Sequence, residues 1–137
     1  APAPPVPAPE KSRAAEPSAL RVLIVDDEPL ILKTAKRLLP QFDVTTTTSP
    51  VQALELVQKQ RFDVIVCDFS MPEMRGDAVF ASAVDLGFDP RRFVLMTGGS
   101  TGPVEHAFGS RRPALLEKPY TRAELEGAIG RAVTTDS

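Results

Sequence analysis

Apolar and polar residues alternate along most of the chain in blocks that have the lengths of strands and helices. Five short blocks are dominated by aliphatic and β-branched residues, the pattern of strands in a sheet that is covered on both faces. They span residues 22–25, 42–48, 62–67, 92–97 and 113–117. The second block, "FDVTTTT", is half polar, which is typical of an edge strand.

Between these strands, apolar residues recur at helical spacing. The pattern predicts helices over residues 28–39, 49–60, 76–87 and 121–133, with a short, weak fourth helix within the glycine-rich residues 98–110. The pairs Ser49/Gln52 and Thr121/Glu124 have the spacing of capping boxes, and Gly87 is the expected end of the third helix. The expected inner-face residues are Ile31, Ala35, Leu38 and Leu39 in the first helix, Leu54 and Val57 in the second, and Leu125, Ala128, Ile129 and Ala132 in the last.

Strands that alternate with helices at these spacings imply right-handed crossovers and an open parallel sheet with helices on both faces. The fold class is therefore α/β. In such sheets ligands bind at the carboxyl ends of the strands, where the winding direction reverses.

Residues 1–19 differ in composition from the rest, because they hold six of the 14 prolines and a single large aliphatic residue, Val6. Such a segment cannot bury enough apolar surface to offset its ordering entropy, so we expect a proline/alanine-rich disordered linker before a domain over residues 20–137. The linker reading is preferred over a proline motif that binds a partner's groove.

Length and charge limit the function. A chain of 137 residues is one ordinary domain, and a net charge of −2 provides no global attraction for nucleic acid or an anionic membrane. No apolar run approaches the roughly 20 residues that span a membrane.

The chain has one cysteine and one histidine. One cysteine cannot form an internal disulfide, and one cysteine with one histidine cannot build a usual zinc site. This composition suits a protein of the reducing cytoplasm. Without a signal peptide or an initial methionine, the chain is expected to be part of a longer or processed protein.

Three carboxylates follow two of the predicted strands. Asp26 and Asp27 end the first, and Asp68 ends the third. Acids before a helix commonly complement its dipole, but two like charges about 4 Å apart repel by roughly 4 kcal/mol at an effective dielectric of 20. A bound cation would remove that repulsion, and an all-oxygen ligand set favours magnesium over zinc or copper.

The other two strand ends carry complementary groups. Thr97 ends the fourth strand, ahead of Gly98 and Gly99, and Lys118 follows the fifth. Taken alone, Thr97 is an ordinary hydroxyl at a strand end and Lys118 is an ordinary surface lysine. Together they form an anion clamp around a carboxylate, which suits phosphoryl transfer with the carboxylate as acceptor.

Four separated motifs, "VLIVDDEP", "VIVCDFSMPEMRG", "VLMTGG" and "LLEKPY", resemble the receiver domain of two-component response regulators. The resemblance covers residues 20–133 and implies a flavodoxin-like, doubly wound five-stranded parallel sheet in the order 2-1-3-4-5. It also implies a phosphoacceptor module of a two-component phosphorelay, whose partner is a histidine kinase or a histidine phosphotransfer domain.

The resemblance assigns a Mg²⁺ site to Asp26, Asp27, Asp68 and Ser70. Asp27 and the backbone carbonyl of Ser70 would bind the ion directly, and Asp26 would act through water. Asp68 would also be the nucleophile that takes the phosphoryl group from a phosphohistidine.

Two further catalytic residues are implied. Thr97 would hydrogen-bond a phosphoryl oxygen, and Lys118 would pair first with Asp68 and then with the phosphoryl group. The bond from Lys118 to the following proline is commonly cis in the family.

The sequence departs from the family at Leu115, where many receivers carry an aromatic residue that reports phosphorylation. Tyr120 should not be mistaken for that switch residue. Ser70 and Gly99 are small and would not exclude water from the phosphoryl group. We therefore expect a phosphorylated state that is not especially long-lived.

The proline/alanine-rich segment together with "MTGG" and "LEKPY" resembles the C-terminal receiver of a bacterial hybrid histidine kinase. A stand-alone regulator is the alternative, and a weak phosphorylation-dependent dimer is considered as well. A pseudo-receiver that only binds protein is a second functional hypothesis. An aspartate-nucleophile phosphatase is disfavoured, because it needs an acid where Ser70 stands.

Overall fold

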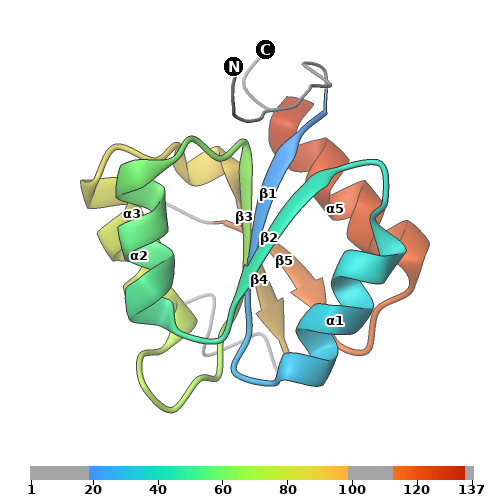
Figure 1. Cartoon of the computed structure of the whole chain (residues 1–137), viewed down its shortest axis with the longest axis horizontal. Coiled ribbons are helices and arrows are strands. Elements are labelled where there is room, and N and C mark those ends of the chain that lie inside the picture. The colour runs from blue at the N-terminus through green and yellow to red at the C-terminus, as the bar shows by residue number, and fades with distance from the viewer. Residues whose placement is uncertain (1–18, 99–112, 135–137) are drawn as a thin grey trace, which may run out of the picture.

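The computed structural model describes residues 19–98 and 113–134, which form a layered α/β domain. All neighbouring strands pair in parallel, and the sheet has the order β2-β1-β3-β4-β5 (Figure 1). The strands are β1 (Arg21–Val25), β2 (Asp43–Thr47), β3 (Val64–Asp68), β4 (Phe93–Thr97) and β5 (Ala114–Glu117). The predicted flavodoxin-like order is confirmed, and the half-polar second strand lies at the edge.

Four α-helices lie in the described part of the chain, rather than the five predicted. They are α1 (Pro29–Leu38), α2 (Pro50–Lys59), α3 (Gly76–Asp85) and α5 (Arg122–Thr134). The expected weak fourth helix falls outside the described residues. The short 3-10 helix η1 (Pro90–Arg92) was not predicted. Gly87 has a φ of 103°, so the left-handed residue expected after the third helix is present.

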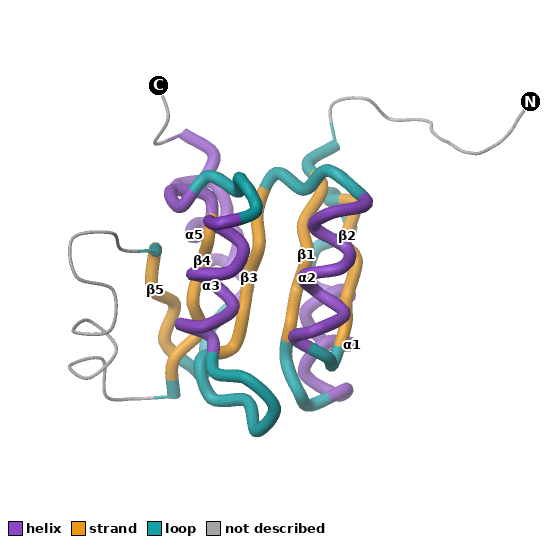
Figure 2. Tube along the Cα trace, turned by 90° about the vertical axis from the view of Figure 1, so that its left-hand side faces the viewer, coloured by secondary structure: helices purple, strands orange, loops and turns teal. Residues whose placement is uncertain are grey.

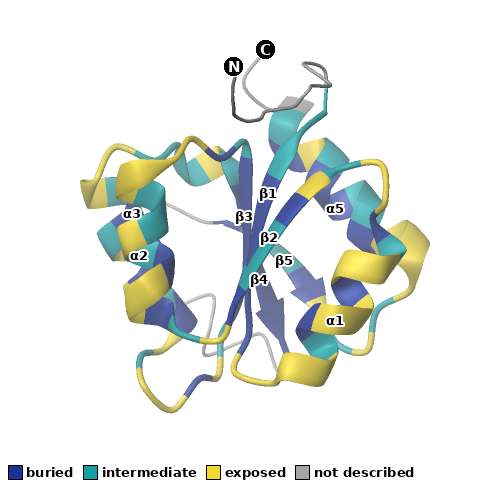
Figure 3. Ribbon diagram, viewed as in Figure 1, coloured by how far each residue is buried: buried dark blue, intermediate teal, exposed yellow. Residues whose placement is uncertain are grey.

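Helices cover both faces of the sheet. One core cluster joins α1 and α5 to one face, and a second joins α2 and α3 to the other (Figures 1 and 2). β3 and β4 are buried along their whole length, and β1 is buried except at its first residue (Figure 3). Continuous apolar runs were therefore the correct signal for these strands, because helices shield both sides of each strand from water.

The inner face of α1 differs from the prediction. Leu32, Ala35 and Leu39 are buried, whereas Ile31 and Leu38 are only half-buried. The apolar stripe of this helix is wider than the part that contacts the sheet, so spacing alone did not show which edge of the stripe would be covered. The four residues expected to face inward from α5 are all buried.

The two predicted capping boxes have different outcomes. The backbone N–H of Glu124 donates to Thr121 Oγ1 at 3.1 Å and the N–H of Thr121 donates to Glu124 Oε1 at 2.8 Å, a complete box. At the second helix, the N–H of Gln52 donates to the Ser49 hydroxyl at 3.1 Å. The Gln52 side chain, however, bonds the hydroxyl of Thr47, which itself accepts from the N–H of Ser49. Only half of that box forms.

Within the described ranges, every helix is too short or too polar to cross a bilayer.

Candidate functional site

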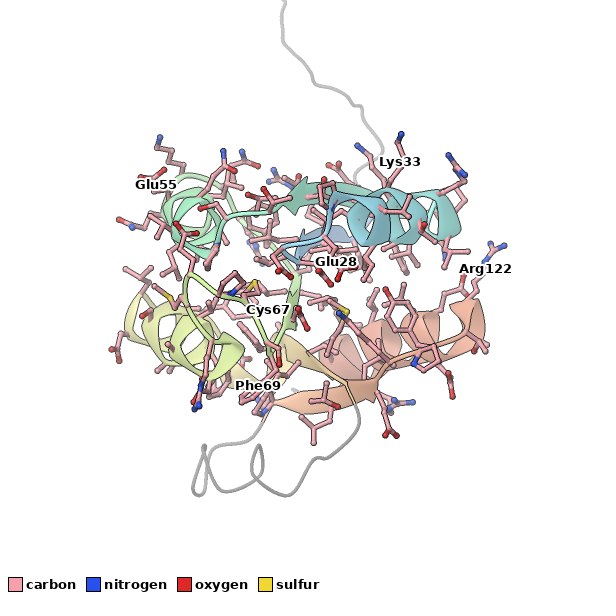
Figure 4. The ribbon with its side chains drawn as sticks, turned by 90° about the horizontal axis from the view of Figure 1, so that it is seen from below. Glu28, Lys33, Glu55, Cys67, Phe69 and Arg122 are labelled. Carbon is pink, nitrogen blue, oxygen red and sulfur yellow. The ribbon has the colours of Figure 1, made fainter. Side chains whose placement is uncertain are left out.

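Three carboxylates lie together at the carboxyl edge of the sheet, which Figure 4 views directly. Asp26 is fully buried and Asp68 nearly so, whereas Asp27 is exposed. One carboxylate oxygen from each of the three lies within 4.8 Å of the other two. The Asp26 side chain is oriented by the backbone N–H of Glu28, which donates to its Oδ1 at 2.9 Å. Since β1 and β3 are neighbours, their ends bring acids 42 residues apart in sequence to one place.

Lys118 bridges two of these acids. Its Nζ lies 2.9 Å from Asp26 Oδ2 and 3.2 Å from Asp68 Oδ1. The backbone N–H of Lys118 donates to the Thr97 carbonyl at 2.7 Å, which fixes the lysine at the end of β4. The bond from Lys118 to Pro119 is cis. The sequence indicated Asp68 as the lysine's partner, but the shorter contact is with Asp26.

Burial and charge act in opposite directions on these groups. The pKa of Asp68 is raised above its ordinary value, first by burial and then by the negative charge of Asp26. The ammonium of Lys118 and the backbone N–H of Ser70 oppose that shift. Burial would lower the pKa of Lys118, but its hydrogen bond to Asp26 and the charge of Asp68 raise it. The amine is therefore held as a cation between two acids.

Thr97 lies at the end of β4, beside the acids, and is 1% exposed. Its Oγ1 is a buried side-chain atom without a hydrogen-bond partner among the described residues. An unsatisfied buried hydroxyl is unfavourable by about 1–3 kcal/mol, so it calls for an explanation. The residue before it, Met96, pairs in register with Asp68. The hydroxyl is therefore available to a ligand oxygen bound next to Asp68.

The acidic cluster can hold a metal ion. Among the described residues, three carboxylates meet one ammonium, which leaves uncompensated negative charge. Opposite oxygens around magnesium are about 4.2 Å apart, since each lies roughly 2.1 Å from the ion, and the 4.8 Å span of the cluster is close to that. Ser70 is exposed, and the role predicted for its carbonyl stays a prediction.

One feature near Asp68, the close packing of Gly76, was not identified from the sequence. A Cβ at Gly76 would lie 2.6 Å from the Asp68 carbonyl oxygen, so only glycine fits where the first turn of α3 meets the end of β3. The glycine in the "MPEMRG" motif was the available signal. The thiol of Cys67 is buried and contacts the Asp68 carbonyl at 3.4 Å. Its pKa is raised well above the ordinary value, mainly by burial, because the thiol lies within an apolar core cluster.

A parallel sheet in this order, with clustered aspartates and a lysine at its carboxyl edge, defines a class of α/β domain, the receiver domain. Residues 22–130 match the family model described as "Response regulator receiver domain". The chain belongs to this family.

Relatives and solved structures agree with that assignment. Two-component response regulators ORR22 and ORR21 from Oryza sativa subsp. indica are 34% identical over 113 residues and 41% identical over 122 residues, each match covering 80% of this chain. The matches cover 16% of either relative, so the chain corresponds to less than a fifth of their length.

Among solved structures, Vibrio cholerae chemotaxis protein CheY4 is similar, with a TM-score of 0.77 and 26% identity over 84% of this chain and 99% of that one. A response regulator receiver protein from Sinorhizobium medicae WSM419 has a TM-score of 0.77 and 25% identity over 89% of this chain and 100% of that one.

Proposed function

We propose that this domain is the phosphoacceptor of a two-component phosphorelay, and that Asp68 takes a phosphoryl group from the phosphohistidine of a histidine kinase or histidine phosphotransfer domain. The observation that carries the proposal is the joint placement of a buried acceptor carboxylate, a lysine ammonium 3.2 Å away and a buried hydroxyl that finds no partner in the described part of the chain. These are the groups that position and neutralise a transferring phosphoryl group.

In the proposed reaction, an Asp68 carboxylate oxygen attacks phosphorus and forms a P–O bond. The P–N bond to the donor imidazole breaks, and the ring nitrogen keeps the electron pair. The Lys118 ammonium screens the negative phosphoryl oxygens from the carboxylates of Asp26 and Asp68. The hydroxyl of Thr97 donates a hydrogen bond to a phosphoryl oxygen. A Mg²⁺ ion held by Asp26, Asp27, Asp68 and the Ser70 carbonyl would neutralise phosphoryl oxygens when bound.

The donor protein has an adjacent surface on which to bind. A groove of about 450 Å³ separates α1 from the loop after β5 and opens beside the lysine. It is mainly apolar, and Leu30 on its rim is 73% exposed. Its lining residues are Leu30, Ile31, Thr34, Leu38, Gly98, Lys118, Pro119 and Tyr120. An apolar helix of the donor would bury this surface and bring a phosphohistidine to the carboxyl edge.

The test is incubation with acetyl phosphate and Mg²⁺, followed by intact mass spectrometry. Wild type should gain the mass of one phosphoryl group, and Asp68→Asn should gain none. Asp85→Asn, which changes an exposed acid at the end of α3, is the matched control and should behave as wild type. An equal, stable gain in Asp68→Asn would remove Asp68 from the proposed role. We also propose a short-lived phosphorylated state, since Ser70 is small and exposed; a half-life of many hours would contradict it.

The wider context is also proposed. Residues 1–19 would be a linker and 20–137 the receiver, most simply as the C-terminal receiver of a cytoplasmic hybrid histidine kinase. A kinase core encoded directly upstream would support this placement. A DNA-binding domain encoded downstream would favour a separate response regulator instead.

A further inference from the structure

The ammonium of Lys118 is carried on a long side chain whose position matters for the site. Its ammonium must stay within 3.2 Å of two carboxylates, yet it sits on a flexible stem that carries roughly 2 kcal/mol of rotamer entropy. Its backbone is fixed by the Thr97 carbonyl. The nearby Gly98 is exposed and has no side chain to pack on the stem, and a Cβ built there would contact nothing within 4 Å.

Tyr120 is the aromatic residue nearest to Lys118 in the sequence. It is half-buried and packs against the core cluster shared by α1 and α5, and it lines the same groove as Lys118 and Pro119. The described part of the chain offers no hydrogen bond to its phenol. The ring, rather than the hydroxyl, therefore anchors the residue.

The phenol is also within electrostatic range of the site. Burial is the main reason why the pKa of Tyr120 is raised; the charge of Lys118 opposes that shift, and the charges of Asp26 and Asp68 add to it. A side chain that packs against the core and also lines the groove beside Lys118 is placed to restrict the positions open to the lysine side chain.

We propose that Tyr120 is a positioning residue for phosphoryl transfer: its ring, which packs against the α1/α5 core and lines the groove beside Lys118, holds the Lys118 ammonium over Asp26 and Asp68. This inference rests on the proposed phosphoacceptor function. It gives the ring a role in the reaction rather than in the core alone, and it makes the groove surface continuous with the reactive site.

A double-mutant cycle tests the inference, with the rate of Asp68 phosphorylation by saturating acetyl phosphate and Mg²⁺ as the readout. Tyr120→Ala should slow the reaction by roughly tenfold or more, since small misplacements of a catalytic group have large effects. Tyr120→Phe should stay within about twofold of wild type. In a Lys118→Ala background, Tyr120→Ala should have an effect of no more than about twofold, because its target is already gone.

Phe42→Ala is the matched control, because Phe42 packs against the same core cluster from the amino-terminal side of β2, away from the lysine. It should lower the urea midpoint as Tyr120→Ala does but leave the rate near that of wild type. Equal slowing by Tyr120→Ala in both backgrounds, loss of rate in Tyr120→Phe, or equal slowing by Phe42→Ala would overturn the inference. If wild type itself is not phosphorylated at Asp68, the proposed function fails as well, so the two failures are distinguishable.

Discussion

Replacing Lys118 with methionine removes an ammonium that contacts both Asp26 and Asp68 while keeping a similar volume. At 2.9 and 3.2 Å, each contact corresponds to about 5–6 kcal/mol of Coulomb attraction at an effective dielectric of 20. Desolvation of the charges offsets much of this, and removal of one partner from a buried pair typically costs about 3–5 kcal/mol. Because the lysine side chain is 22% exposed, we expect the free energy of unfolding to fall by about 3 kcal/mol without Mg²⁺.

The loss of unfolding free energy in Lys118→Met should depend on pH. The folded-state pKa of Asp68 is raised above 3.8, so this carboxyl contributes stability that is fully present below pH 3.8 and is lost as pH rises through its folded pKa. Lys118→Met removes an opposing charge and a hydrogen bond, which moves that pKa further up. The variant should therefore be closer to wild type at about pH 5 than at about pH 8.

Urea denaturation followed by circular dichroism, with EDTA and then with Mg²⁺, measures both effects. Equal m-values would show that the same transition is compared, and Mg²⁺ at 100 times its dissociation constant should restore about 2.7 kcal/mol. Lys33→Met is the control, because Lys33 is an exposed residue of α1 (Figure 4) and should change stability by less than about 0.5 kcal/mol. A deficit below about 1 kcal/mol, or one that does not change with pH, would refute the bridging role assigned to Lys118.

Three further predictions concern the frame around the acids. Thr97→Val removes a buried hydroxyl that has no partner within residues 19–98 and 113–134. It should leave the free energy of unfolding unchanged or raise it by up to about 1 kcal/mol, and it should slow phosphorylation by acetyl phosphate. A lower urea midpoint would contradict this. Gly76→Ala forces a Cβ against the Asp68 carbonyl and should destabilise by about 1–3 kcal/mol, measured as a lower melting temperature; an unchanged value would show that the turn yields freely. Glu124→Ala removes the reciprocal bond to the Thr121 N–H and should lower unfolding free energy by about 0.5–1 kcal/mol, whereas Glu124→Gln should retain most of it.

Much of the fold could be predicted because its signals are local. The central strands are continuous apolar runs, and the complete capping box at Thr121 and Glu124 uses atoms three residues apart. The limits of local reasoning appear at α1, where Leu32 rather than Ile31 is buried. They appear again at Gln52, whose side chain bonds Thr47 in the preceding strand instead of closing its own box.

The residues of the candidate site could be predicted from the sequence, but their contacts could not. Asp26, Asp27, Asp68, Thr97 and Lys118 were all named from the sequence, since each follows a strand and the carboxyl ends of parallel strands share one edge. The dominant partner of Lys118 could not be named, because that contact joins residues 92 positions apart and a difference of a few tenths of an ångström selects Asp26.

The sequence alone therefore determined the strands, their alternation with helices and the set of chemical groups at one edge of the sheet, because periodicity and strand ends are properties of neighbouring residues. Only the tertiary structure decided that the ammonium bridges two acids, that the Thr97 hydroxyl has no partner among the described residues and that Tyr120 lines the same groove as the lysine. Those features depend on how distant side chains share one buried space, where packing and desolvation act on all of them together.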